Sequence, residues 1–313
     1  MVNISKCLLL PIDGSTESLR SIDFIVRLYP GARDVNLILS YFTPALPPIY
    51  AGTVVESPDL LKGRRNFIAT REKNTRRVFE DARKKLIAAG LSEELMQEHV
   101  QQKEMTVAKH ACLLADTRKV DAIVVQKKVS SGLEGFLKGD SPSVLLQHCM
   151  ASPIWFTEGD IEDLNAAICV NNEPATLRVA DHAAFMLAGT SASITLLHVS
   201  KSISNPILCG FSEVDEVLGD WAETHAGREV MPFLRSSAQA VIDNGVEESR
   251  IRTALVPHRR DKVGEILSWC RANGIGIIGL GHSKPGGVWS FLKASVTRKI
   301  LSDFKNMAVW VTQ

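Results

Sequence analysis

The chain has 313 residues, of which 45% are hydrophobic and 23% are charged, and its formal net charge is +1. This balance is typical of a globular protein, and the small net charge gives no global electrostatic reason to expect binding to nucleic acid or to anionic membrane. No stretch reaches the roughly 18 apolar residues of a membrane span, and the amino terminus lacks the pattern of a signal peptide, so we expect a cytoplasmic protein.

Six cysteines are spread through the chain without any Cys-x-x-Cys pair. In a cytosolic protein this spacing favours reduced, buried thiols over disulfides or a zinc site. No histidine shows the spacing of a metal ligand, and we expect no metal centre. The cysteines are Cys7, Cys112, Cys149, Cys169, Cys209 and Cys270.

The first half reads as strands alternating with helices. Residues 6–12 form a continuous apolar run, which is typical of a strand buried on both faces, and a helical face follows at 19–29. The stretch 43–62 holds four prolines and is expected to be irregular, covering a cleft or binding a partner. The remaining predicted elements are strands at 35–41, 98–103, 121–126 and 153–157, and helices at 64–89, 107–117 and 142–149, with a polar loop after residue 126.

The predicted helix at 64–89 is densely charged, with Arg64-Arg65 near its start and acidic residues such as Glu72 and Glu80 further along. Because both signs are interspersed, the pattern favours a solvated helix face over a nucleic-acid surface.

The second half repeats the order of the first. The linker is the short acidic segment 159–164. The predicted strands are 167–170, 194–199, 251–256, 275–280 and 307–312, and the predicted helices lie near 176–188, 216–244, 261–273 and 295–304.

The two halves also align residue by residue. Asp13 falls on Asn171 at an offset of 158, and Gln126 to Gly139 falls on Gly281 to Ala294 at an offset of 155, without a gap. A period this long exceeds the roughly 20–50 residues of a solenoid repeat. We therefore predict a duplicated domain, with boundaries at 1–158 and 164–313.

Strands that alternate with helices imply right-handed crossovers and a parallel sheet covered on both faces. The predicted fold class is α/β, with two tandem copies of a five-stranded, parallel, doubly wound sandwich. The closing strands, Ile154-Trp155-Phe156 and Val309-Trp310-Val311, are apolar on both faces although each lies at a sheet edge. Exposed apolar edges promote aggregation, so we expect these strands to cover each other in an intramolecular pseudo-dimer.

At Asp13 and the segment Gln126–Asp140 the chain resembles the universal stress protein family in its tandem form. Relatives open with an apolar strand ending in Asp, and their second strand often ends in Leu-His-Val, as in Leu197-His198-Val199 and weakly in Leu39-Ser40-Tyr41. ATP-binding members carry a Gly, two residues, Gly, nine residues, Gly and Ser or Thr after the fourth strand. The resemblance implies an adenine nucleotide alpha hydrolase-like fold with the nucleotide at the carboxyl ends of the first and fourth strands, where open sheets generally bind ligands.

Glycines matter in such a loop because a phosphate reaches backbone N–H groups only where no Cβ intervenes. In the first copy one glycine of three survives, Val129 disfavours a left-handed backbone, and Asp140 would repel phosphate. The first copy is therefore predicted to be degenerate. Its site residues are Asp13, Tyr41, Gln126, Val129, Gly139 and Asp140.

The second copy departs less severely from the phosphate-loop pattern. Lys284 brings a positive charge and Ser295 keeps a hydroxyl at a helix start, although Lys284 could equally be a solvated side chain. His282, next to this loop, is the histidine that we single out for a functional test. The candidate ligand residues are Asn171, Val199, Gly281, His282, Lys284, Ala294 and Ser295.

These observations predict a non-catalytic stress-response module with a degenerate nucleotide-type cleft and no catalytic residues. Two alternatives remain open, namely an ATP- or ADP-binding protein with its site in the second copy, and a binder of another small ligand in the same cleft. No cofactor is certain, a homo-oligomer is possible, and neither nucleic acid nor membrane is an expected partner.

Overall fold

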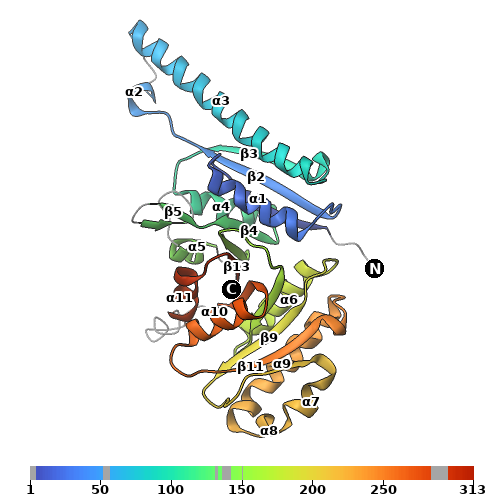
Figure 1. The fold of residues 1–313 in the computed structure, drawn as a ribbon. Coiled ribbons are helices and arrows are strands. Elements are labelled where there is room, and N and C mark those ends of the chain that lie inside the picture. The colour runs from blue at the N-terminus through green and yellow to red at the C-terminus, as the bar shows by residue number, and fades with distance from the viewer. Residues whose placement is uncertain (1–4, 52–56, 131–132, 136–141, 150, 283–294) are drawn as a thin grey trace. The chain divides into compact units, whose positions relative to one another are not determined.

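The computed structural model describes residues 5–51, 57–130, 133–135, 142–149, 151–282 and 295–313. Its contacts divide the chain into two compact units, Met1–Ser152 and Pro153–Gln313, which we describe one at a time (Figure 1).

The sheet of the first unit is parallel, with the strand order β4-β1-β2-β3. Its central strand β1 has no more than partial exposure at any position, as the continuous apolar run predicts. The strands are β1 (Lys6–Pro11), β2 (Val35–Thr43), β3 (Met96–Gln102) and β4 (Ala122–Gln126).

Helices of the first unit form three contacting pairs, α1 with α3, α2 with α3 and α4 with α5. Helix α3 starts at Pro58, six residues before the predicted start, because Ser57 lies in extended backbone and proline suits the first helical position. The helices are α1 (Thr16–Leu28), α2 (Pro48–Ala51), α3 (Pro58–Ala88), α4 (Val107–Arg118) and α5 (Pro142–His148), with a 3-10 turn η1 (Glu93–Leu95).

The segment after β4, predicted to be a polar loop, begins instead with a β-hairpin. Strand β5 (Lys128–Ser130) pairs antiparallel with β6 (Leu133–Gly135), and Val129 lies opposite Glu134. The β-branched Val129 thus sits in extended backbone, the conformation that suits it.

The second unit has a mixed, mostly parallel sheet with the order β10-β11-β9-β8-β12-β13-β7. Two strands are antiparallel to their neighbours. Strand β10 was not predicted and pairs with β11, and β7 pairs with β13. The strands are β7 (Ile154–Glu158), β8 (Asn165–Cys169), β9 (Ile194–Ser200), β10 (Ile207–Gly210), β11 (Ile251–Pro257), β12 (Ile275–Gly281) and β13 (Met307–Thr312).

The single helix predicted over 216–244 is broken into three. Thr224 caps the longest piece, because its hydroxyl accepts a hydrogen bond from the Gly227 N–H at 3.0 Å. The helices of this unit are α6 (Ala175–Leu187), α7 (Val214–Val217), α8 (Gly219–Ala222), α9 (His225–Asp243), α10 (Lys262–Ala272) and α11 (Ser295–Asp303), with 3-10 turns η2 (Phe211–Glu213) and η3 (Glu248–Arg250).

The two closing strands pair with each other, which confirms that part of the prediction. Trp310 of β13 lies opposite Trp155 of β7 in the antiparallel register. Their rings stack with centroids 3.8 Å apart, and both side chains are fully buried. Each strand therefore covers the apolar edge of the other.

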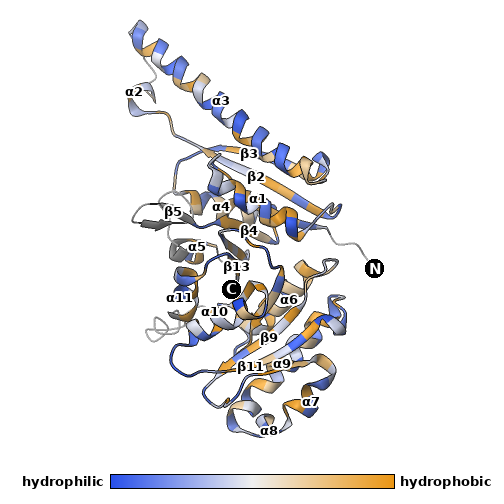
Figure 2. Cartoon of the chain, in the orientation of Figure 1, coloured by the Kyte–Doolittle hydropathy of each residue, from blue (hydrophilic) through white to orange (hydrophobic). Residues whose placement is uncertain are grey.

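Apolar residues concentrate in the strands and on the inner faces of the helices, whereas α3 is mostly hydrophilic along its length (Figure 2). Across the described residues, no helix combines the length and the apolar character that crossing a membrane would require.

One prediction about the cysteines is wrong. Cys112 of α4 and Cys149, which follows α5, form a disulfide with their Cα atoms 4.9 Å apart. At the offset of 155 the corresponding residues of the second copy are Leu267 and Phe304, both buried. The spacing in the sequence gave no sign of the bond, because the contact between α4 and α5 is tertiary and no local pattern reveals it. Cys7, Cys169, Cys209 and Cys270 are free thiols.

Candidate functional site

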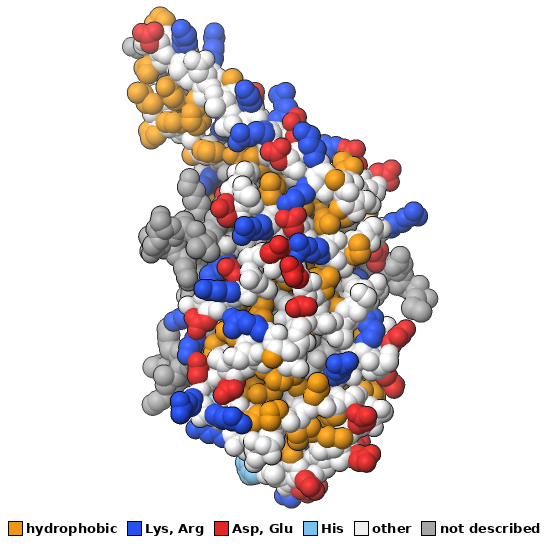
Figure 3. Space-filling model, in the orientation of Figure 1, with side chains coloured by type: hydrophobic (Ala, Val, Ile, Leu, Met, Phe, Trp, Pro, Cys, Tyr) orange, Lys and Arg blue, Asp and Glu red, His pale blue; other side chains and the backbone are white. Residues whose placement is uncertain are grey.

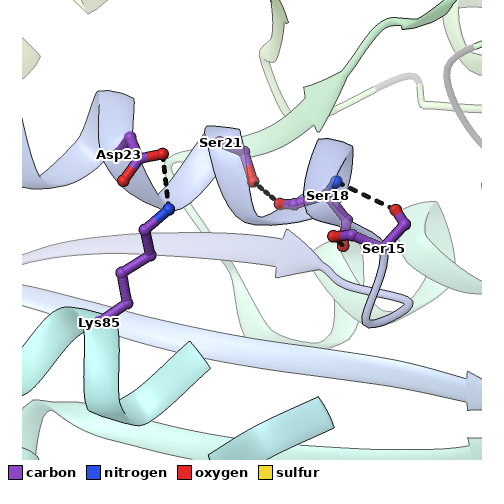
Figure 4. Close-up of polar contacts among 5 residues, drawn as sticks. All are labelled: Ser15, Ser18, Ser21, Asp23 and Lys85. Atoms are coloured by element: carbon purple, nitrogen blue, oxygen red, sulfur yellow. Dashed lines mark hydrogen bonds and ion pairs between the residues drawn. The ribbon is translucent and has the colours of Figure 1, made fainter. Parts of the chain in front are cut away.

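The turn after β1 is built around Asp13. Its Oδ1 accepts hydrogen bonds from the Ser15 N–H at 3.1 Å and the Ser15 hydroxyl at 2.6 Å. Ser15 in turn caps α1, since its Oγ accepts from the Ser18 N–H at 3.2 Å (Figure 4). The same view shows Lys85 of α3 paired with Asp23 of α1 at 2.6 Å. Asp13 is thus part of the helix start as well as a predicted ligand residue.

The turn after β8 repeats this arrangement at the offset of 158. The Asn171 N–H donates to the Thr176 hydroxyl at 3.2 Å, as the Asp13 N–H donates to Ser18 at 3.4 Å. Asn171 Oδ1 accepts from the Thr176 hydroxyl at 2.7 Å and from the Glu173 N–H at 3.1 Å. An amide oxygen meets these structural demands as well as a carboxylate oxygen does, so the chief difference between the copies at this position is charge.

The second strand is aligned differently from the prediction. Leu8 of β1 pairs with Leu37, whereas its counterpart Ala166 pairs with Ile194, so the offset here is 157 and not 158. Tyr41 therefore corresponds to His198, and Val199 corresponds to Phe42. A shift of one residue moves a side chain to the opposite face of a sheet. The predicted equivalence of Tyr41 with Val199 is wrong.

In the first copy, Tyr41 lies close to the first-strand turn. Burial raises the pKa of the Tyr41 hydroxyl, the Asp13 carboxylate raises it further, and Arg77 of α3 acts in the opposite direction. The ring meets Phe79 of α3 edge to face, with centroids 6.5 Å apart. The structure thus brings Asp13 and Tyr41 together.

In the second copy, His198 is buried and its tautomer follows from its partner. Nδ1 lies 2.9 Å from the Val170 carbonyl oxygen, which only accepts, so Nδ1 carries the proton. Burial lowers the pKa of His198, and its ring lies 5.6 Å from that of Trp221 on α8. His198 is therefore a buried histidine that is held by the backbone next to Asn171.

Lys262, at the first position of α10, is a further candidate residue that the sequence analysis did not single out. Burial raises the pKa of the Cys169 thiol to about 12, and the Lys262 charge lowers it in part. The same charge also contributes to the lowered pKa of His198, after burial. Lys262 thus places a positive charge at the start of α10, next to the Asp261 carboxylate that caps the helix and pairs with Lys299. The counterpart of Lys262 in the first copy is Val107, and comparison of these two positions could have found it.

The fourth strands end in a second matched pair. Gln126 of β4 corresponds to Gly281 of β12, and the next residues are Lys127 and His282. Lys127 is buried at 5% exposure, and burial lowers the pKa of His282. Lys127 was also missed, and it gives the first copy a cation at the carboxyl end of the sheet. Each copy therefore has a nitrogen-containing side chain directly after its fourth strand, a lysine in the first and a histidine in the second.

Gly281 has a structural explanation. A Cβ at this position would lie 2.5 Å from the carbonyl carbon and oxygen of Ala175, at the start of α6. Helix α6 and strand β12 approach too closely for any side chain at this point. Packing therefore accounts for this glycine without a phosphate.

Several predicted site residues lie outside the described part of the chain, namely Gly139, Asp140, Lys284 and Ala294. Of two others only the backbone is described, since Val129 belongs to β5 and Ser295 begins α11.

Within the ranges that the structure describes, no group of three or more His, Cys, Asp or Glu side chains could hold a metal ion. The described polar groups of the second cleft are amide, imidazole, thiol and ammonium groups at the carboxyl ends of parallel strands. Such groups can bind a polar or anionic ligand by hydrogen bonds and charge.

The fold and these sites define a tandem α/β protein with a nucleotide-binding-like architecture in each copy. Residues 5–152 match the universal stress protein family. The first copy therefore belongs to the universal stress protein family, and the second copy repeats its α/β fold.

Two solved structures cover nearly the whole chain. A universal stress protein from Archaeoglobus fulgidus DSM 4304 is similar with a TM-score of 0.64 and 14% identity, covering 99% of this chain and 98% of its own. A protein of unknown function from Pseudomonas aeruginosa PAO1 has a TM-score of 0.53 and 14% identity, with coverages of 99% and 92%. At this identity the likeness concerns the fold alone. A comparison with curated proteins found no match.

Proposed function

We propose that this tandem universal stress protein is a non-catalytic stress-response module in which the second copy keeps the better-preserved ligand cleft. The observation that carries the proposal is the hairpin β5–β6 in the first copy. Extended backbone around Val129 replaces the glycine-rich turn that lets backbone N–H groups approach a phosphate.

The cleft of the second copy is supported by three described features. Asn171 keeps the turn geometry of Asp13 without its negative charge. The buried His198, whose pKa is lowered by burial, is held by the backbone next to it, and Lys262 supplies a cation at the start of α10. These groups suit an anion or a nucleotide held loosely by charge. A second candidate function, binding of ATP or ADP at this cleft, rests on the same groups, and another small ligand is the third candidate.

The proposal predicts asymmetric binding, and calorimetry with ATP and ADP tests it. Lys262→Ala and Lys284→Glu should weaken binding by about tenfold or more, since each removes a favourable charge. Asp140→Ser and Lys127→Ala in the first copy are the matched changes and should leave the affinity within about twofold. Binding that disappears with a first-copy change and survives both second-copy changes would reverse the assignment.

A thermal-shift screen with ATP, ADP, AMP and buffer anions separates the ligand classes. A ligand at about 100 times its Kd stabilises the folded state by about 2.7 kcal/mol. A shift with a non-nucleotide anion alone would favour the third candidate, whereas no shift with any of these compounds would count against a cleft that binds anions or nucleotides.

The proposal also predicts that the protein does not hydrolyse ATP. Phosphoryl transfer needs precisely placed donors and cations around the transferring group, and a misplacement of about 1 Å can cost about a hundredfold in rate. We expect no phosphate release above the blank with Mg²⁺ or Mn²⁺. Turnover that follows the purified protein and is lost in Lys284→Ala, Ser295→Ala would contradict this.

We further propose that the repeat boundaries, 1–158 and 164–313, delimit two domains that form an intramolecular pseudo-dimer. The pairing of β7 with β13 supports it, because these strands close the first and second repeats. Proteolysis in the linker 159–164 should leave the two fragments together on sizing. Fragments that separate as soluble monomers would refute the pseudo-dimer.

The cytoplasm remains the proposed compartment, and whether the Cys112–Cys149 disulfide persists in the cell can be tested. Cytosolic thiols are normally kept reduced, so the bond needs protection by burial, and both residues are buried. Rapid alkylation of cells with a maleimide of high mass should label the pair only after denaturation and reduction. Labelling after denaturation alone would show that the pair is reduced in the cell.

A further inference from the structure

The N-terminal two thirds of α3, residues 58–77, contain no buried residue. The buried residues of α3 are Val78, Phe79, Ala82 and Leu86, all in its C-terminal half. The remaining 20 residues would form about 30 Å of helix. Helices in proteins owe most of their stability to a packed face, and an isolated helix of this length is marginal in water.

Charge works against this helical segment as well. Residues 58–77 contain seven Lys or Arg residues and two Asp or Glu residues. Lys73 is followed by Arg76 and Arg77 at helical spacings of three and four, and like charges at these spacings destabilise a helix. A negatively charged partner would relieve this repulsion.

Apolar side chains mark the same region. Tyr50 of α2 packs onto α3, with its ring 6.3 Å from that of Phe67 and its hydroxyl so close to Gly63 that a Cβ there would lie 2.6 Å from it. This contact places Ile49, 62% exposed, beside α3, where Leu61 is 40% exposed. Figure 3 shows hydrophobic side chains gathered at the α2 end of α3 and basic side chains along the helix.

A surface of opposite character lies on the second unit. The segment 211–224, which forms η2, α7 and α8, contains five Asp or Glu residues and no Lys or Arg. Asp215 and Glu223 pair with arginines of α9, whereas Glu216 and Asp220 make no ion pair within the described residues. Val217, 44% exposed, lies in this segment, and Leu208, 46% exposed, lies on the neighbouring strand β10.

The surface on α2 and α3 and the surface on α7, α8 and β10 match each other in charge and in exposed apolar side chains. Within the described residues, eight large apolar side chains are exposed, and four of them lie on these surfaces. One surface is basic and the other acidic, and opposite charges at an interface steer association and set its specificity. A second copy of the chain carries both surfaces, so a two-fold dimer would form the contact twice.

We propose that the protein self-associates through these surfaces, with the segment 58–77 of one copy docking on the α7–α8 surface of a second copy. The apolar anchors Ile49 and Leu61 meet Leu208 and Val217, and the basic side chains face the acidic ones. The contact buries the segment of α3 that has no buried residue in the single chain.

Sedimentation velocity over a range of protein concentrations tests the proposal. The unmodified chain should dimerise reversibly, and the Kd should rise by about tenfold or more between about 50 and 500 mM NaCl, because salt screens exposed charges. Arg64→Glu with Arg65→Glu should abolish the dimer, and so should Glu216→Arg with Asp220→Arg. The matched control, Lys84→Glu with Lys109→Glu, changes the net charge equally outside both surfaces and should leave the Kd within about threefold.

Mixing the two reversed variants gives the decisive measurement. Each variant alone faces two repulsive contacts, whereas a mixed dimer has two attractive ones, so an equimolar mixture should recover the dimer. The acidic-surface variant remains informative if the Arg64→Glu, Arg65→Glu chain loses its helix, because it leaves α3 unchanged. A monomer at all concentrations in low salt, or a mixture that stays monomeric, would overturn the proposal. A monomer whose segment 58–77 instead binds DNA or anionic vesicles would overturn it in favour of another occupant.

Discussion

The histidine beside the tryptophan stack of the second unit should make the stability of that unit depend on pH. His182 of α6 accepts a hydrogen bond at Nε2 from the Trp155 indole N–H at 2.9 Å. Burial lowers the pKa of His182 to about 3. Protonation would both charge this enclosed ring and remove the acceptor, so the folded unit should resist it. We expect His182→Gln, which keeps an acceptor but does not titrate, to abolish this pH dependence.

The size of the effect follows from the difference between the folded and unfolded pKa. The unfolded value is 6.5 and the folded value about 3, so the unfolded chain binds the proton more tightly. The free energy of unfolding therefore falls as the pH decreases from about 6.5 toward about 3, by up to about 1.4 kcal/mol per pH unit. Between pH 7 and pH 5 the loss from this one residue is about 2 kcal/mol. Above pH 7 its contribution is fully present.

The distribution of aromatic residues provides a selective assay. All five tryptophans lie after residue 152 and all three tyrosines lie before it, so indole fluorescence reports on the second unit. Urea unfolding at pH 7 and pH 5, followed by indole emission, gives the free energy of unfolding for each variant. His225→Gln on the exposed start of α9 is the matched control.

The unmodified chain should lose about 2 kcal/mol more than His182→Gln between these pH values, and His225→Gln should behave like the unmodified chain. Losses that agree within about 0.5 kcal/mol for all three proteins would refute the argument, because His182 would then titrate as it does in the unfolded chain.

Three further changes have expected outcomes. His110→Leu removes the acceptor of two backbone N–H groups and should destabilise the first unit by about 1–3 kcal/mol, measured by hydrogen exchange in α4; unchanged exchange would contradict this. Replacing Cys112 and Cys149 with serine removes a cross-link between residues 37 positions apart and should lower the free energy of unfolding by about 4 kcal/mol. Adding reductant should change the stability of the unmodified chain and not that of the serine variant. Gly281→Ala forces a Cβ against Ala175 and should lower the free energy of unfolding of the second unit by about 1–3 kcal/mol, measured by urea unfolding with and without ligand. A loss of ligand affinity without this loss of stability would instead indicate a role in phosphate binding.

The fold could be predicted because its signals are local and repeated. The buried runs that became β1 and β8 are continuous in the sequence, and the helix start at Ser15 follows from a hydroxyl before an apolar periodic face. The duplication itself is visible by aligning the chain with itself. Even the turn at Asp13 and Asn171 keeps the same hydrogen bonds at the predicted offset.

The candidate site was predicted only in part, since its residues come from different strands. Asp13 and Tyr41 lie together, as do Asn171 and His198, but Lys127 and Lys262 were missed. Lys127 follows β4 and Lys262 begins α10, and only the sheet topology places these two positions at the carboxyl ends of the strands. A lone lysine at such a position carries no pattern that distinguishes it from a solvated one.

Tertiary structure decided the remaining features, because each depends on contacts between distant segments. The register of β9 on β8 differs by one residue from that of β2 on β1, and no local pattern reveals a shift that hydrogen bonds across the sheet set. The disulfide formed because two helices brought Cys112 and Cys149 within reach. Gly281 was read in the sequence as part of a phosphate loop, whereas the close approach of α6 explains it. The sequence by itself determined where strands and helices form, and the packing of these elements determined which side chains meet.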